Sequence, residues 1–144
     1  MKQIVIDASV ALKWFLADED YSKIALELLD KYVSFEFEII APSLLEYEVL
    51  NGLQIARKRG RIEEENAIMA FEGFIDLGID KKNISSIYLK IIHFSEAYNL
   101  SAYDASYLGV ADQEGIELVT ADKNLFNRTK TNLKWIKWLG DFRC

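Results

Sequence analysis

Four acidic residues lie far apart in the 144-residue chain, and two of them directly follow short apolar segments. Asp7 follows Ile4–Ile6, and Asp122 follows Leu118–Ala121. Such runs are typical of buried parallel strands, and open α/β sheets bind ligands outside the carboxyl ends of their strands. Oxygen ligands delivered to one crevice suit a hard cation, so the pattern indicates metal-dependent hydrolysis. The four acids are Asp7, Glu48, Asp104 and Asp122.

Each acid also has a structural explanation when it is taken alone. Asp7 and Asp122 suit helix N-caps, because Asp accepts hydrogen bonds from the free N–H groups there. Asp104 lies three residues after Ser101, which is the spacing of a capping box. Taken together, several carboxylates repel one another and raise each other's pKa unless a cation compensates. Mg²⁺ or Mn²⁺ meets that need, because these ions bind through a few carboxylates and several waters.

The helix expected over residues 43–59 separates a structural acid from a functional one. Ser43 and Glu46 fit a capping box at its start. Glu48 falls at the margin of the helix face that we expect to be buried, where a carboxylate needs a partner. Glu48 is therefore the candidate for the site, and Glu46 is not. The expected buried face comprises Leu45, Val49, Gly52, Leu53 and Ala56.

The composition disfavours several other kinds of protein. The one histidine, His93, lies inside an expected helix, and the one cysteine is Cys144, so neither a zinc site nor a Ser/His/Asp triad is expected. A single cysteine fits a reducing cytoplasm. No apolar run approaches the roughly 20 residues of a membrane span, and the N-terminus leads directly into a strand rather than a signal peptide. The net charge of −6 argues against a broad basic groove, but not against a small site containing cations.

Strand and helix patterns alternate along the chain. Strands are expected at about 3–6, 37–41, 117–120 and 133–136, and helices at about 10–16, 20–32, 43–59, 63–76, 84–98, 101–114 and 124–128. Residues 43–98 show no strong strand signal. No linker or repeat is visible, so we expect one domain over residues 1–144. The predicted fold is α/β, a three-layer α/β/α sandwich with a short, mainly parallel sheet of about four or five strands and about six or seven helices.

Four motifs follow one another along the chain: Asp7-Ala8-Ser9, Pro42 through Tyr47-Glu48-Val49 to Asn51, Leu100-Ser101-x-Tyr103-Asp104-Ala105, and Val119-Thr120-Ala121-Asp122. In this order they make the chain resemble the PIN-domain ribonucleases, most closely the VapC-type toxins of prokaryotic toxin–antitoxin pairs. The resemblance extends from about Ile4 to Trp135 and implies that the four acids hold Mg²⁺ or Mn²⁺, Asp7 and Asp104 most directly. By the same resemblance, Ser9 and Thr120 orient the acids and Asn51 is a polar companion of the glutamate.

The resemblance also implies the reaction, which is hydrolysis of RNA phosphodiester bonds by a metal-activated water that Glu48 or Asp122 orients. Lys123 and Asn124 follow Asp122 where some relatives carry another acid, so a strong second metal site is not expected. One dense basic cluster either holds RNA phosphates or only satisfies the cation preference of a helix C-terminus. It comprises Arg57, Lys58, Arg59 and Arg61.

The partners implied by the resemblance are an RNA substrate, a cognate antitoxin protein and a second copy of the chain in a homodimer. The antitoxin segment is expected in a groove among the first helices, where the apolar stripe around Trp14, Phe15, Leu16 and Leu28 serves either the groove or the core. Two other readings stay open. One is a catalytically inactive PIN-like module that binds RNA or protein, whose usual sign is the loss of an acid, and the other is a PIN nuclease of RNA processing.

Overall fold

The computed structural model describes all residues, 1–144, and contains one parallel sheet with the strand order β3-β2-β1-β4-β5. The central strand β1 is apolar and fully buried over Ile4–Ile6, as expected for a strand that is covered on both faces. The strands are β1 (Lys2–Ile6), β2 (Phe37–Pro42), β3 (Asp80–Lys82), β4 (Glu117–Thr120) and β5 (Ile136–Trp138).

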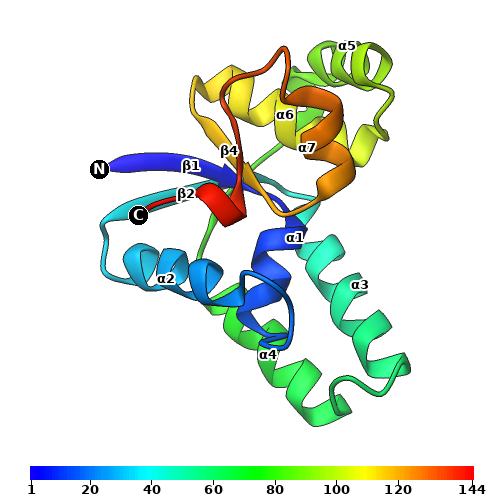
Figure 1. Ribbon diagram of the computed structural model, residues 1–144. Coiled ribbons are helices and arrows are strands. Elements are labelled where there is room, and N and C mark those ends of the chain that lie inside the picture. The colour runs from blue at the N-terminus through cyan, green and yellow to red at the C-terminus, as the bar shows by residue number, and fades with distance from the viewer.

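Seven α-helices form the outer layers. Helices α1 to α4 lie on one side of the sheet and α5 to α7 on the other, so the three-layer α/β/α prediction is confirmed (Figure 1). The helices are α1 (Ala8–Ala11), α2 (Ser22–Val33), α3 (Leu45–Lys58), α4 (Glu64–Asp76), α5 (Tyr88–Tyr98), α6 (Ala102–Glu114) and α7 (Lys123–Thr129). Short 3₁₀ helices η1, η2 and η3 occupy Leu12–Trp14, Ile84–Ser86 and Leu139–Asp141. No helix is long and apolar enough to cross a membrane.

The direction of winding reverses between β1 and β4. The chain moves from β1 outward through β2 to β3, and then returns to place β4 on the other side of β1. Such a switch point leaves a crevice at the carboxyl ends of the two strands. The β1–β4 register pairs Ile6 with Val119, so the next residues, Asp7 and Thr120, meet at this crevice.

Helix α6 is the most deeply buried helix, because seven consecutive residues, Ala105–Ala111, are buried between the sheet and α5. The side-chain oxygen of Ser101 accepts a hydrogen bond from the Asp104 N–H at 3.1 Å and caps the start of the helix. Gly115 ends it in the left-handed conformation (φ +67°) that glycine adopts most easily. Both ends of α6 thus agree with the sequence prediction.

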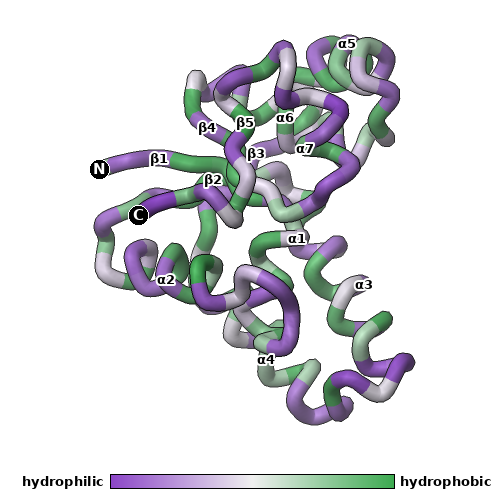
Figure 2. The backbone as a smooth tube through the Cα atoms, in the orientation of Figure 1, coloured by the Kyte–Doolittle hydropathy of each residue, from purple (hydrophilic) through white to green (hydrophobic).

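Helices α3 and α4 form a hairpin whose outer end is mainly hydrophilic (Figure 2). Four of the five residues expected on the inner face of α3 are buried, namely Leu45, Val49, Leu53 and Ala56. The fifth, Gly52, lets α3 approach η1 closely. A Cβ atom at this position would lie 2.4 Å from the Leu12 side chain, so a larger residue requires that side chain or the two elements to shift.

Two strand predictions were wrong. Residues 43–98 were predicted without a strand, yet β3 pairs with β2 through Asp80 and Ile40. Its sequence, Asp-Lys-Lys, is polar throughout, as suits an edge strand, and therefore carries no hydrophobic pattern. The last strand was predicted at 133–136 but lies at Ile136–Trp138, where it pairs with β4 in the register Leu118 to Ile136.

The predicted capping box at Ser43 and Glu46 was also wrong. The N–H of Ser43 donates to the Lys82 carbonyl and continues the β2–β3 pairing, so α3 begins only at Leu45, without a side-chain cap. Glu46 instead pairs with Lys81 Nζ at 2.9 Å. Similarly, the helix expected over 10–16 is divided into α1 and η1.

Candidate active site

Asp7 lies immediately after β1, 5% exposed, and every hydrogen bond to its carboxylate comes from a neighbouring backbone or hydroxyl group. Oδ1 accepts from the Ser9 hydroxyl at 2.5 Å and from the Val10 N–H at 3.4 Å. Oδ2 accepts from the Thr120 hydroxyl at 2.5 Å. Since a carboxylate oxygen has two lone pairs, Oδ2 retains one for a further ligand.

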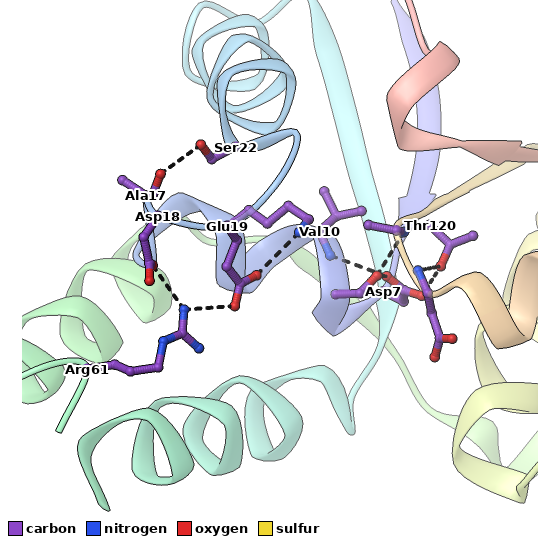
Figure 3. Close-up of polar contacts among 12 residues, drawn as sticks. Asp7, Val10, Ala17, Asp18, Glu19, Ser22, Arg61 and Thr120 are labelled. Carbon is purple, nitrogen blue, oxygen red and sulfur yellow. Dashed lines mark hydrogen bonds and ion pairs between the residues drawn. The ribbon is translucent and has the colours of Figure 1, made fainter. Parts of the chain in front are cut away.

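The two hydroxyl groups that hold Asp7 are themselves held by the backbone after β4. The Ala121 N–H donates to Ser9 Oγ at 2.9 Å, and the Asp122 N–H donates to Thr120 Oγ1 at 3.0 Å. Each hydroxyl therefore accepts one bond and donates its proton to Asp7. The bond from Thr120 to Asp7 is drawn in Figure 3. This arrangement fixes the carboxylate with few rotatable groups, as expected of a preorganised site.

Asp122 caps α7, as its sequence context suggested, and remains available for a second role. Its Oδ1 accepts the Leu125 N–H at 3.2 Å. The cap uses one oxygen and fixes the side chain in place, so that Oδ2 stays free for a ligand. Helix capping and ligand binding are thus compatible explanations for this residue and not competing ones.

Glu48 comes from α3 and Asp104 from the first turn of α6, and both are partly buried. The hydroxyl of Tyr107 donates to Glu48 Oε1 at 2.5 Å. Tyr107 itself is only 1% exposed. No motif in the sequence singles out Tyr107, although it lies three positions after Asp104 and therefore on the same face of α6.

Electrostatic coupling links the four acids. Burial raises the pKa of Asp7 to about 6, against the opposing hydrogen bonds from Ser9 and Thr120. Burial is also the main cause that raises the pKa values of Glu48 and Asp104. The charge of Asp122 further raises the pKa of each of the other three acids, so Asp122 is their common neighbour.

The donor chemistry of this site fits Mg²⁺ or Mn²⁺ better than zinc. No three His, Cys, Asp or Glu side chains are grouped in a way that could hold a metal ion. Zinc sites need such a compact set, whereas Mg²⁺ binds through one or two carboxylates and retains several waters. The one histidine, His93, is exposed on α5. Carboxylate oxygens are, however, the type of donor that Mg²⁺ and Mn²⁺ prefer.

Several other candidate residues are not brought into the site. Asn51 is exposed and makes no side-chain hydrogen bond, and the observed companion of Glu48 is Tyr107. In the basic cluster, Arg57 pairs with Glu64 at 3.2 Å. Arg61 pairs with Asp18 and Glu19 at 2.9 and 3.2 Å (Figure 3). Lys58 and Arg59 are exposed and form no ion pair.

The apolar stripe assigned either to a groove or to the core is largely core. Trp14, Leu16 and Leu28 are buried, and the Trp14 indole N–H donates to the Ala25 carbonyl at 2.9 Å. Phe15 is only partly buried and packs against the core.

The fold and the site together define a parallel α/β protein that gathers carboxylates at the switch point of its sheet. A family model described as PIN domain matches residues 4–132, and the chain belongs to this family. Among curated relatives, Ribonuclease VapC9 of Mycobacterium tuberculosis is 32% identical over 123 residues, covering 85% of this chain and 87% of that protein. These findings confirm the resemblance seen in the sequence.

Solved structures share the fold. PAE2754 from Pyrobaculum aerophilum superimposes with a TM-score of 0.70 at 21% identity, over 96% of this chain and 85% of that one. A toxin–antitoxin complex from Klebsiella pneumoniae contains a chain with a TM-score of 0.55 at 18% identity, over 92% of this chain and 94% of that one. At these identities the likeness concerns the fold alone.

Proposed function

We propose that this protein is a divalent-metal-dependent endoribonuclease that hydrolyses RNA phosphodiester bonds as the toxin of a VapBC-type pair. One observation carries the proposal: acids from four segments are electrostatically coupled around the switch point, and none of them has a cationic partner. No ion pair of the structure includes Asp7, Glu48, Asp104 or Asp122. The curated relatives named VapC ribonucleases support the reaction, and the presence of all four acids argues against an inactive module.

Mg²⁺ or Mn²⁺ would be held by Asp7, Asp104, Asp122 and Glu48. When bound, the cation supplies charge stabilisation at the scissile phosphate and lowers the pKa of a bound water. Ser9 and Thr120 keep the Asp7 carboxylate in one orientation through their hydroxyl protons. Glu48 Oε1 is occupied by the Tyr107 hydroxyl, which leaves Oε2 to accept a proton from the attacking water.

The proposal includes an antitoxin partner, a homodimer and a cytoplasmic location. A structural neighbour described as a toxin–antitoxin complex supports the antitoxin. The homodimer is supported by the outer face of α5, where Tyr88, Leu89 and Ile92 are about half exposed or more. Apolar side chains at this helical spacing form one continuous surface, of the kind that subunit interfaces cover.

The proposed function is tested by RNA cleavage with purified full-length protein. We expect cleavage with Mg²⁺ or Mn²⁺, none with EDTA, and no detectable cleavage by Asp7→Asn or Asp104→Asn variants whose circular dichroism matches wild type. Equal cleavage by wild type and both variants points to a contaminating nuclease and contradicts the proposal. Mapping the cleaved RNA ends after expression without the antitoxin distinguishes a toxin from an RNA-processing enzyme.

A further inference from the structure

We infer that an aromatic pocket beside the carboxylates holds one unpaired nucleobase of the RNA strand, next to the scissile bond. The inference rests on the proposed nuclease function and adds a substrate subsite to it. The pocket is open, has a volume of about 310 Å³, and is named here the Tyr21–Trp138 pocket. Its lining comprises Tyr21, Lys123, Phe126, Asn127 and Trp138.

The pocket adjoins the acids through two elements. Trp138 in β5 pairs in register with Thr120 in β4, the residue whose hydroxyl binds Asp7. Adjacent strands lie about 4.8 Å apart, so one strand spacing separates these two backbones. On the other side, Lys123 directly follows Asp122 in the chain. A nucleotide whose phosphate lies at the acids can therefore place a neighbouring base in this pocket.

The aromatic rings form an open corner and leave surface for stacking. Tyr21 and Trp138 meet edge to face, with ring centroids 5.7 Å apart, and Phe126 lies 5.6 Å from Trp138. Tyr21 is 43% exposed. The Trp138 indole N–H makes no hydrogen bond within the protein and is not sealed from solvent. Unpaired bases stack on aromatic faces and present acceptor atoms at their edges, so this corner offers both kinds of contact.

The backbone at Tyr21, which forms one side of this corner, has an unfavourable conformation. Tyr21 has a φ of +64°, which is rare for a bulky residue and costs conformational energy. Gly140 leaves the space that the rings need: a Cβ atom there would lie 2.6 Å from Trp138 Nε1 and 2.9 Å from Tyr21 Cε1. Strained backbone of this kind concentrates at ligand sites, where function compensates for its cost.

The electrostatic surroundings favour a polyanion. A second pocket of about 410 Å³ shares Phe126 and Trp138 with the first. Its five cations outnumber its two acids, although the whole chain carries a net charge of −6. Of these cations, Lys130, Lys134 and Arg143 form no ion pair and remain available for phosphates. By contrast, half of the basic cluster at the end of α3 is neutralised by Glu64, Asp18 and Glu19.

The test measures binding and cleavage separately. Anisotropy of a short labelled single-stranded RNA in EDTA gives Kd without cleavage, and assays with Mg²⁺ give KM and kcat. We expect Tyr21→Ala to raise Kd and KM about tenfold, as loss of one stacked base does, with kcat changed less than about twofold. Tyr21→Phe, which retains the ring, should bind like wild type. Tyr21→Gly removes the ring while suiting the positive φ, so it keeps the test valid if the alanine variant folds poorly.

Phe35→Ala is the matched control, because Phe35 is also aromatic, 81% exposed and at positive φ (+61°). It precedes β2 and so lies at the amino ends of the parallel strands, whereas the acids follow the carboxyl ends of β1 and β4, so this substitution should leave Kd and KM unchanged. An abasic nucleotide beside the cleaved bond should weaken binding to wild type and not weaken binding to Tyr21→Ala further. That non-additivity identifies the base as the occupant.

Unchanged Kd and KM in Tyr21→Ala overturn the subsite, as does an abasic RNA that binds wild type normally. Failure of the subsite is distinguishable from failure of the proposed function. If wild type and Tyr21→Ala cleave RNA with the same metal-dependent KM and kcat, only the subsite is refuted. If Tyr21→Ala binds RNA more weakly but wild type does not cleave it, only the nuclease function is refuted.

Discussion

The acids at the switch point and the acids in the loop before α2 have opposite electrostatic surroundings. Asp18 and Glu19 both form ion pairs with the Arg61 guanidinium, and Glu19 also pairs with Lys13 at 3.3 Å. The hydrogen bond from Arg61 holds the pKa of Asp18 below its usual value. In contrast, burial raises the pKa of Asp7, for which the chain supplies no cation. An acid that receives a cationic partner on folding serves the structure, whereas an acid that is buried without one is available for a ligand.

Two glutamates on α3 provide the largest test of this contrast, because they lie two residues apart. Glu46 pairs with Lys81, whereas Glu48 faces Tyr107 and the other site acids. We expect Glu48→Gln to lower kcat by about 10²-fold, as loss of a general base does, and Glu46→Gln to change it by less than about twofold. Single-turnover RNA cleavage measures both. Lys81→Gln is the matched control and should behave like Glu46→Gln, and a larger loss in Glu46→Gln than in Glu48→Gln refutes the distinction.

Tyr107 should have a smaller effect, because it acts through Glu48. Its hydrogen bond lowers the pKa of Glu48, so Tyr107→Phe should raise that pKa further. We expect kcat to fall about tenfold, which corresponds to loss of one hydrogen bond to a charged group. The acidic limb of the pH–rate profile should move to higher pH, because Glu48 must be ionised to accept a proton.

The pH profile distinguishes positioning from simple packing. If Tyr107→Phe lowers activity at all pH values equally, Tyr107 supports only the fold. In the Glu48→Gln background the substitution should add little, since its partner is already absent. Tyr103→Phe on the same helix is the control, because Tyr103 is 66% exposed and should leave the profile unchanged.

The hydrophobic pattern predicted those parts of the fold that depend on burial. The inner face of α3 and the central strands followed from it, because apolar side chains at regular spacing have few alternatives to the core. The polar edge strand β3 carries no such pattern and was missed. The same limit applied to the site. Local motifs predicted the candidate acids, but the Tyr107–Glu48 contact joins residues 59 positions apart, and the pairing of Arg61 with Asp18 spans 43. Such pairings depend on how helices pack, which single-sequence patterns do not specify.

The smallest effect concerns stability and compares Asp7 with Asp18 directly. In metal-free protein above pH 6, ionised Asp7 is disfavoured by roughly 3 kcal/mol, from the rise of its pKa from 3.8 to about 6. Asparagine removes that charge but leaves one hydroxyl proton without an acceptor, which costs about 1–2 kcal/mol. We therefore expect Asp7→Asn to inactivate the protein and yet to stabilise it by about 1–2 kcal/mol, with Tm about 3–6 °C higher.

The pH dependence of stability separates the effects of Asp7→Asn and Asp18→Asn. The folded pKa of Asp7 lies above its unfolded value, so its contribution to stability declines as pH rises through about 4 to 6. The advantage of Asp7→Asn should therefore be complete near neutral pH and absent below about pH 4. Asp18 has a lowered pKa, so Asp18→Asn should instead lose a little stability near neutral pH and none in acid. Thermal unfolding in EDTA across this range measures both.

Added Mg²⁺ should raise the Tm of wild type but not of Asp7→Asn, because only the ionised acid binds the cation. A destabilised Asp7→Asn at neutral pH would show that Asp7 already has its partner within the fold, and the contrast between paired and unpaired acids would no longer locate the site.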